Sequence, residues 1–512
     1  MARRVNIVRV FTSFADGISP QEAVIEVSIV QGLPTFDVIG LCDSSIRESR
    51  GRIQPALIAS GFQMPKGHIT ASISPAFMKK SGTSFDLPIA IGMLVASGQL
   101  SVNPGSRIYA TGEISLDGLI RATPLSPLRM KIAGGNYDYV FIPEGEVNGA
   151  RCAGVRAMTV KRLSDLRAVF EQGDYRPLSF NLDDVEYDDC AVRDFSVLKG
   201  QSKAARTLLI AASGFHNVLL LGSPGCGKTM AGRLLAGIMP PLEGSEIGDV
   251  FSAMEAYGIG DEHGKESLCL GKSRPFRYIY PGMNRSRILG SAVKLIPGEF
   301  ALANHGVLFA DEIFEYSREI LEAMRVPLED RVVRMSKDGR NYAFPASFVF
   351  IAAGNPCKCG MLYESGKRCT CTPRVRSTYL SKLSGPMRDR IDLVTEMRSV
   401  SGEELKESMN SENDDISSSM RSRVKSCWDR QKERYGERGI FNGTNETVDA
   451  EILKASREVV DYASSLTETY GLSARGFNRV MRVGRTIADL EDRDYMICDD
   501  VAEAAIYRKK DW

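Results

Sequence analysis

A glycine-rich segment near the middle of the chain limits the fold more than any other feature. Residues 222–229 read Gly-Ser-Pro-Gly-Cys-Gly-Lys-Thr, after an apolar run and before a helix-like run, MAGRLLAGI. This order of strand, loop and helix predicts a P-loop, whose backbone N–H groups surround phosphate at a helix N-terminus in an α/β domain. Lys228 is expected to reach the β- and γ-phosphates, and the Thr229 hydroxyl to bind Mg²⁺. We therefore expect ATP to be held by Gly222, Ser223, Pro224, Gly225, Cys226, Gly227, Lys228 and Thr229.

Two apolar runs downstream end in polar residues suited to hydrolysis. Val307-Leu-Phe-Ala precedes Asp311 and Glu312. Asp311 can hold Mg²⁺ through its water shell, and Glu312 can act as general base on the attacking water. Asn355 follows the run SFVFIAAG and can orient that water, although Asn-Pro is also an ordinary turn signal. Together with the P-loop, these residues predict an ATPase.

The composition suits a soluble protein of several domains. The 512 residues are 43% hydrophobic and 25% charged, and 65 basic against 64 acidic residues leave a net charge of +1. That balance neither favours nor excludes nucleic acid, because binding needs only a local basic surface. No apolar run reaches the length of about 18 residues that a membrane span needs. Since the eleven cysteines are mostly scattered, as reduced thiols are, we expect a cytoplasmic protein without membrane contact.

Changes in pattern divide the chain. Residues 1–176 alternate apolar strands such as AVIEVSIV and RIYATGEISL with Gly and Pro turns, and LPIAIGMLVASGQL predicts a buried helix among them. An acidic linker is expected over 177–194 and an α/β core over 195–398. Residues 399–512 begin with an exposed polar segment (401–415), and their later pattern is helical.

Longer segments resemble the ComM/YifB family of magnesium-chelatase-like AAA+ proteins over essentially the whole chain. They include GLPTFDVIGLCDSSIRESRGRIQPALIASGF, PGEFALANHGVLFADEI, AAGNPCKCG, LSGPMRDRIDL and LSARGFNRVMRVGRTIADLE. The resemblance implies an N-terminal α/β domain with the fold of the Lon protease domain, a central AAA+ P-loop domain and a C-terminal helical lid. It also implies a hexameric ring of identical chains with ATP bound between neighbours.

The resemblance gives roles to further residues. It makes Arg390 an arginine finger that reaches the next subunit's ATP, with Arg388 as the alternative. It makes Arg475 a lid residue that contacts the γ-phosphate within its own subunit. For a single arginine a surface salt bridge is the commoner role. The segment that borders the adenine is expected to contain Phe195, Val197 and Gln201.

Lon-type proteolysis needs a serine activated by a lysine. Ser84 falls near the place of the nucleophile, but Ser126 or Pro127 stands where the resemblance leads one to expect the lysine. Without that base a serine hydroxyl is a poor nucleophile. We therefore expect the first domain to be a binding or assembly module without protease activity.

Four cysteines form two close pairs, Cys357 with Cys359 and Cys369 with Cys371. Four thiolates suit a tetrahedral zinc site, but C-x-C is tighter than the usual spacing, so reduced cysteines without a metal remain the alternative. Because the cluster follows Asn355, a bound metal would couple the ATP site to a partner surface.

The substrate moved by ATP hydrolysis is the open question. The family resemblance implies DNA, single-stranded or branched, and a helicase that drives branch migration in natural transformation and recombination. A magnesium-chelatase-type or chaperone-like ATPase that remodels a protein complex is the alternative. One departure bears on this choice, because residues 278–281 read Tyr-Ile-Tyr-Pro where the family usually has a His-His pair after Pro-Phe-Arg.

Two segments are candidates for DNA contact. Residues 421–438 are basic, with Trp428 and Tyr435 interleaved, although a charge-rich helix is more often merely solvated. Residues 332–346 have the turn chemistry of a hairpin and stand where ring translocases place pore loops. Their candidate DNA contacts are Arg334, Lys337 and Arg340.

Overall fold

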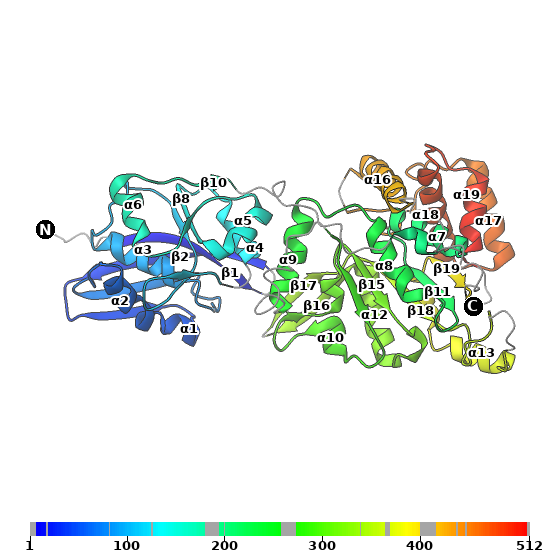
Figure 1. Ribbon diagram of the computed structural model, residues 1–512, viewed down its shortest axis with the longest axis horizontal. Helices are drawn as coiled ribbons and strands as arrows, with labels where there is room; N and C mark the ends of the chain where they lie inside the picture. The colour runs from blue at the N-terminus through cyan, green and yellow to red at the C-terminus, as the bar shows by residue number, and fades with distance from the viewer. Residues whose placement is uncertain are drawn as a thin grey trace. The chain divides into compact units, whose positions relative to one another are not determined.

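The computed structural model describes residues 7–16, 19–80, 82–123, 126–179, 194–198, 200–257, 273–337, 339–363, 369–399, 416–436, 439–445 and 448–508. The chain forms two compact units (Figure 1), one from residues 1–187 and 243–271 and the other from 188–242 and 272–512. Most of the expected linker (180–193) and the polar segment 401–415 lie outside the described residues.

The first unit is built on a mixed sheet of eight strands in the order β10-β9-β8-β5-β1-β2-β4-β3. Its strands are β1 (Ile7–Asp16), β2 (Ser19–Val30), β3 (Thr35–Ile39), β4 (His68–Ser74), β5 (Ile108–Ala110), β8 (Tyr139–Pro143), β9 (Arg156–Val160) and β10 (Leu178–Ser179). The expected strand AVIEVSIV is part of β2, which alternates buried and less buried residues. The expected strand RIYATGEISL is instead two short strands, β5 and β6 (Glu113–Ile114), because Gly112 turns the chain at φ 144°.

A buried helix, α3 (Asp86–Ala96), covers β1 and β2, and it confirms the helix predicted from LPIAIGMLVASGQL. Gly92 lies so close to β2 that a Cβ there would come within 2.6 Å of Val27 Cγ2. Apolar residues on every side of the helix explain why it is buried all round. The remaining elements of residues 1–187 are α1 (Ser44–Arg47), α2 (Ser49–Ala59), β7 (Ile120–Arg121), α4 (Ser126–Ala133), η1 (Glu144–Glu146), α5 (Val147–Ala153) and α6 (Asp165–Gln172).

Helix α9 (Ser245–Tyr257) also belongs to the first unit, although it follows the P-loop helix in the sequence. It packs on α4 and α5, and Lys131 Nζ on α4 lies 3.1 Å from Asp249 Oδ1 on α9. The expected core domain, 195–398, includes this segment. Its place in the first unit depends on contacts between distant residues, which a reading of local pattern does not detect.

The second unit contains a parallel sheet of five strands in the order β12-β15-β18-β11-β19. Its strands are β11 (Val218–Gly222), β12 (Phe276–Ile279), β15 (Val307–Ala310), β18 (Val349–Gly354) and β19 (Leu393–Met397). The three expected strands VLLLG, GVLFAD and SFVFIAAG form β11, β15 and β18, and all residues of these strands are buried, as in a sheet covered on both faces.

Helices α7 (Ser202–Gly214) and α8 (Lys228–Ile238) pack on this sheet. The short helix η3 (Phe195–Leu198) precedes the first strand. Between the strands lie α10 (Arg285–Leu289), β13 (Gly290–Ser291), β14 (Ile296–Pro297), α11 (Glu299–Leu302), η4 (Ile313–Glu315), α12 (Arg318–Asp330), β16 (Val332–Lys337), β17 (Arg340–Pro345), α13 (Pro373–Leu380) and α14 (Gly385–Arg388).

The C-terminal part of the second unit is helical, as expected. It contains α16 (Ile416–Tyr435), α17 (Arg457–Tyr470), α18 (Ala474–Leu490) and α19 (Cys498–Ile506). These helices share one apolar core with α7 and α8, so the lid and the parallel sheet belong to the same unit (Figure 1). Among the described residues, no helix is both long and apolar enough to cross a membrane.

Candidate ATP site

Neighbouring parallel strands bring the expected ATP-site residues to one edge of the second sheet. Strand β11 leads into the P-loop, β15 into Asp311 and β18 into Asn355. Strand β18 pairs in parallel with both of the others, so the three segments leave the sheet at the same edge. Crevices at the carboxyl ends of such strands are where α/β proteins bind ligands.

The P-loop turns sharply and then begins α8. Gly225 and Gly227 have φ angles of 83° and 92°, in the left-handed region that glycine adopts without steric cost. Lys228 Nζ donates hydrogen bonds to the carbonyl oxygens of Gly222, at 2.6 Å, and Ser223, at 2.9 Å. The ammonium therefore lies within the loop, where a bound phosphate would replace these carbonyls as its partner.

The acidic pair after β15 is held in a defined orientation. Asp311 Oδ2 accepts a hydrogen bond from the Tyr278 hydroxyl at 2.9 Å, and its Oδ1 accepts one from the Glu312 N–H at 2.9 Å. Glu312 is exposed and has φ 46° and ψ 47°, a conformation that costs free energy for a residue other than glycine. Burial and the bond to Asp311 raise the pKa of Tyr278 to about 12, so this hydroxyl stays protonated and donates.

The oxygen donors suit magnesium. Thr229, the second residue of α8, offers a hydroxyl, and Asp311 offers a carboxylate; both are hard ligands of the kind that Mg²⁺ takes beside nucleotide phosphates. When bound, the ion neutralises charge that develops on the phosphates. Asn355 is half-buried beside them, and a Cβ on Gly360 would lie 3.0 Å from Pro224 Cδ and 4.0 Å from Asn355 Cγ. The cysteine-containing loop thus contacts the P-loop.

A separate cavity of about 270 Å³ is rich in arginine, with five arginines against two acids in its lining. We call it the arginine cavity; its charged residues are Arg331, Arg390, Arg475, Arg479, Arg482, Glu329 and Asp392. Arg390 is largely buried, is paired with Glu329 and donates from Nε to the Arg325 carbonyl at 2.9 Å. Arg475 is exposed and makes no ion pair with any described residue.

The structure brings the two expected arginines, Arg390 and Arg475, into the lining of this one cavity, which includes no P-loop residue. The alternative finger, Arg388, donates to the carbonyls of Leu383, at 3.0 Å, and Leu380, at 2.7 Å. Of the residues expected near the adenine, Phe195 and Gln201 are buried and Val197 is 41% exposed.

Sequence reasoning missed most of this cavity. Asp392 accepts from Arg479 at 2.6 Å and from the backbone N–H of Asn217 at 2.9 Å. Burial alone would raise the pKa of Asp392, but the charge of Arg479 and the bond to His216 outweigh it and hold the pKa well below its ordinary value. A signal was present in the sequence, because Arg475, Arg479 and Arg482 recur at helical spacing on α18.

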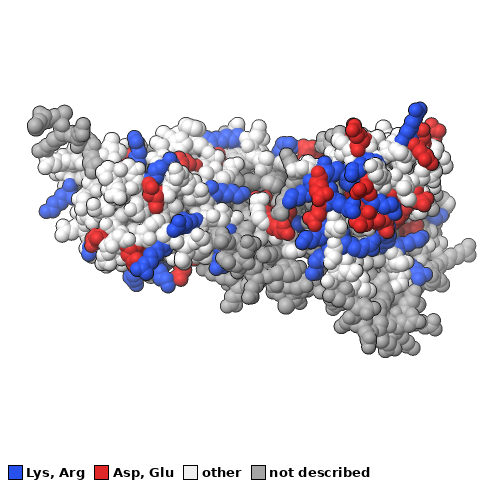
Figure 2. Space-filling view, turned by 90° about the horizontal axis from the view of Figure 1, so that it is seen from above, with Lys and Arg blue, Asp and Glu red and all other residues white. Residues whose placement is uncertain are grey.

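The two aromatic side chains of the basic segment 421–438 are held by contacts within the second unit, and a contact of this segment with DNA stays a prediction. The indole N–H of Trp428 donates to the Ala212 carbonyl at 3.0 Å, and the Trp428 ring packs on Phe441 with 4.7 Å between ring centroids. The Tyr435 hydroxyl bonds to Asn442 Oδ1 at 2.8 Å. Both aromatic rings therefore stabilise the lid. Figure 2 shows acidic side chains interleaved with the basic ones on this face of the second unit.

The hairpin expected over 332–346 is confirmed by the antiparallel pairing of β16 and β17. Arg334 is exposed and paired with Asp330, whereas Lys337 and Arg340 are half-buried and lie opposite each other next to the turn. Contact of these three side chains with DNA stays a prediction.

The four clustered cysteines come together as the spacing suggested. Their sulfur atoms all lie within 4.8 Å of one another, and Cys357 Sγ is 3.4 Å from Cys359 Sγ and 3.6 Å from Cys369 Sγ. A hydrogen bond from the Met361 backbone lowers the pKa of Cys359 to about 6. Four sulfur donors at this separation fit a tetrahedral metal such as zinc.

In the first unit, Ser84 is 5% and Ser126 3% exposed, and the Ser126 hydroxyl donates to Glu255 Oε1 at 3.4 Å. Neither serine has a bond to a lysine among the described residues. The likeness of this unit to Lon, and its lack of protease activity, remain predictions.

Models of known protein families and curated relatives match the sequence of both units. Three family models match: "Magnesium chelatase, subunit ChlI" over residues 194–405, "Subunit ChlI of Mg-chelatase" over 25–146 and "Magnesium chelatase, subunit ChlI C-terminal" over 414–508. YifB of Escherichia coli strain K12 is 32% identical over 98% of this chain and 97% of its own length. The competence protein ComM of Haemophilus influenzae is 29% identical over 98% of each chain.

A more distant relative is the magnesium-chelatase 38 kDa subunit of Cereibacter sphaeroides. It is 25% identical over 32% of this chain and 52% of its own. The matches to YifB and ComM are stronger evidence for the family than this partial match, because they span both units. The chain belongs to the ComM and YifB family of magnesium-chelatase-like AAA+ ATPases.

Proposed function

We propose that this chain is a ring-forming ATPase that couples hydrolysis to movement along DNA. The observation that carries the ATPase part is the placement of the P-loop, Asp311 and Asn355 at the ends of three neighbouring parallel strands. In this proposal Lys228 and Thr229 hold Mg-ATP with Asp311, Glu312 takes a proton from the attacking water, and Asn355 orients that water.

The arginine cavity is proposed to serve a neighbouring subunit. Five guanidinium groups facing two carboxylates favour an anion as its ligand, and Arg475 has no acidic partner of its own among the described residues. Because Arg390 and Arg475 share this cavity and no P-loop residue lines it, we assign both arginines to the ATP of the next subunit. For Arg475 this proposal replaces the role within its own subunit that the family resemblance implied. A ring, expected to be a hexamer, brings the cavity and the P-loop of adjacent chains together.

DNA is proposed as the substrate because a full-length relative is named a competence protein. The hairpin of β16 and β17 supplies candidate contacts in Arg334, Lys337 and Arg340. These are basic side chains of a two-stranded ribbon, and contacts of basic side chains with phosphate do not depend on the DNA sequence. Branched DNA is the substrate that this proposal favours, in transformation and recombination. A chelatase-type or chaperone-like ATPase is the alternative, and the experiment below separates them.

We further propose that Cys357, Cys359, Cys369 and Cys371 bind Zn²⁺. The mutual approach of the four sulfur atoms within 4.8 Å supports it. The metal would fix the loop that places Gly360 against Pro224 and so stabilise the P-loop. Elemental analysis should give about one zinc per chain, lost in Cys369→Ser and retained in Cys498→Ser. A wild-type protein without zinc would contradict this assignment.

The decisive measurement is ATP hydrolysis without DNA and with single-stranded, duplex or branched DNA, beside Lys228→Ala. Stimulation by branched DNA that is absent in Lys228→Ala would support the DNA-dependent ATPase. If hydrolysis is lost in Lys228→Ala but indifferent to every DNA, the helicase proposal fails and remodelling of a protein complex takes its place.

A further inference from the structure

Two tyrosines lie at the acidic end of the ATP site, and none of the roles described so far uses them. Tyr278 belongs to β12, the strand beside β15, and pairs with Phe309 in the ladder. Its ring stacks on Phe309, with centroids 5.8 Å apart and planes at 11°. This packing directs the hydroxyl to Asp311 Oδ2, 2.9 Å away.

With the hydrogen bond from Tyr278, both carboxylate oxygens of Asp311 have a donor. One carboxylate oxygen accepts from the Glu312 N–H and the other from Tyr278, each at 2.9 Å. A carboxylate held at both oxygens keeps its rotamer, and its remaining lone pairs point in a fixed direction. Partners of this kind orient metal ligands in many sites, and their removal weakens metal affinity.

Tyr316 follows η4 and is 4% exposed. Its hydroxyl has no hydrogen-bond partner among the described residues, and it lies within electrostatic range of Tyr278, Asp311 and Glu312. A buried hydroxyl without a partner is costly, and such groups usually bind an ion, a water molecule or a ligand. The partner that this location offers is the hydrated metal ion carried in with the nucleotide.

We propose that both hydroxyls belong to the magnesium–nucleotide site: Tyr278 positions Asp311, and Tyr316 bonds to the water shell of the ion beside Glu312. The inference rests on the proposed ATPase function and adds two residues to it. Tyr278 is a positioning residue, since it acts through Asp311, whereas Tyr316 acts through the water shell of the ion.

The test is the affinity for a fluorescent ADP analogue, measured with Mg²⁺ and with Mg²⁺ omitted. We expect Tyr278→Phe and Tyr316→Phe each to weaken binding about tenfold with Mg²⁺, the loss typical of a hydrogen bond to a charged group. Without Mg²⁺ the two variants should bind like wild type. Tyr280→Phe is the matched control, because Tyr280 lies two residues away and is not assigned to the site.

Thermal unfolding of the nucleotide-free protein distinguishes these roles from packing. Removing an unpaired buried hydroxyl in Tyr316→Phe should leave the Tm unchanged or raise it, while the Mg²⁺-dependent affinity falls. Unchanged affinity in both variants, or a Tm that falls with unchanged affinity, would overturn the inference and leave the ATPase proposal standing. If wild type and Lys228→Ala bind the analogue equally weakly, the ATPase proposal itself fails.

Discussion

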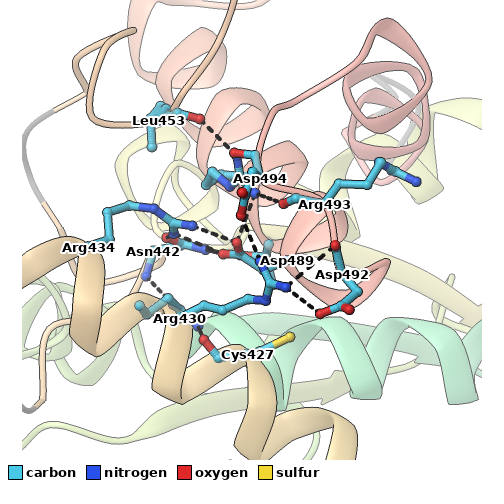
Figure 3. A network of polar contacts seen from close by, with 12 residues as sticks. Cys427, Arg430, Arg434, Asn442, Leu453, Asp489, Asp492, Arg493 and Asp494 are labelled. Carbon is cyan, nitrogen blue, oxygen red and sulfur yellow. Dashed lines mark hydrogen bonds and ion pairs between the residues drawn. The ribbon is translucent and has the colours of Figure 1, made fainter.

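Two arginine-rich regions of the second unit differ in how many acids accompany their arginines. In the lid, four arginines meet four aspartates; we call this group the lid network, and Figure 3 shows part of it. Its members are Arg430, Arg434, Arg485, Arg493, Asp489, Asp492, Asp494 and Asp500. In the arginine cavity five arginines meet only two acids. The first group is balanced and the second carries an excess of positive charge.

At the centre of the lid network, Asp489 is completely buried and accepts from Arg434, at 2.6 and 2.9 Å, and from Arg485, at 2.9 Å (Figure 3). Asn442 donates to it as well, at 3.0 Å. Every acceptor site of this carboxylate is used inside the protein, so nothing is left for a ligand. The cavity differs because Arg475 has no such partner among the described residues. The number of arginines in a region is therefore a poor predictor of anion binding. The number of arginines that lack an acidic partner is a better one.

The largest expected effect concerns the cavity. Arg390→Ala should lower ATP turnover on the order of 10³–10⁵-fold, because an arginine finger stabilises the transition-state charge. The variant retains an intact P-loop, so nucleotide binding should persist. Arg388→Ala is the matched control and should keep its turnover.

Mixing variants tests whether the cavity acts between subunits. Lys228→Ala chains lack a working P-loop but keep Arg390, whereas Arg390→Ala chains have the reverse defect. Mixed assemblies should therefore recover part of the hydrolysis that each variant lacks alone. If Arg390 acted within its own chain, no mixture would regain activity.

The next largest effect is expected in the lid network. Asp489→Ala leaves two buried guanidinium groups without their carboxylate, which should cost about 3–5 kcal/mol of unfolding free energy. Denaturant unfolding measures it. Asp492→Ala, at a side chain that is 78% exposed, should cost about 0.5 kcal/mol or less and serves as the control. Equal losses in the two variants would remove the distinction between buried and exposed members of this network.

The sequence predicted the strands and loops that carry the candidate ATP site far better than it predicted the contacts of either arginine region. The P-loop, Asp311 and Asn355 were recognisable because their chemistry depends on short motifs at strand ends, and the parallel strands beside them are continuous apolar runs. Tyr278 could not be assigned in this way, since its contact with Asp311 depends on which strand lies beside β15. Pairing between separate segments is a property of tertiary structure.

The same reason explains why the partners of residues in 421–438 could not be predicted. Basic residues and Trp428 looked like a nucleic-acid surface, but their partners lie in segments far away in the chain. Arg430 pairs with Asp492 and Asp494, and Arg434 with Asp489. Local composition cannot show which of these charges are neutralised by another segment once the chain has folded.

The effect of pH distinguishes the two acids that line the arginine cavity, because Asp392 is deeply buried and Glu329 is not. Its pKa is lowered in the folded protein, so its contribution to stability is complete above the unfolded value of about 3.9 and is lost as the pH falls below it. The destabilisation caused by Asp392→Asn should therefore be largest above about pH 5 and shrink toward pH 2. A difference between variant and wild type that does not change with pH would contradict this assignment.

The smallest effects are expected from one arginine of each region. The variant in the arginine cavity should lose turnover, and the variant in the lid network should lose stability. Arg475→Ala removes an exposed cation that has no partner among the described residues, so its unfolding free energy should match wild type while turnover falls about tenfold, as for one lost charge-assisted hydrogen bond. Arg430→Ala breaks pairs with two exposed aspartates; it should lose about 1 kcal/mol or less and keep its turnover. The test measures the ATP turnover and the unfolding free energy of both variants. Loss of stability in Arg475→Ala together with full activity would reverse the comparison, because the cavity would then serve the fold and not the nucleotide.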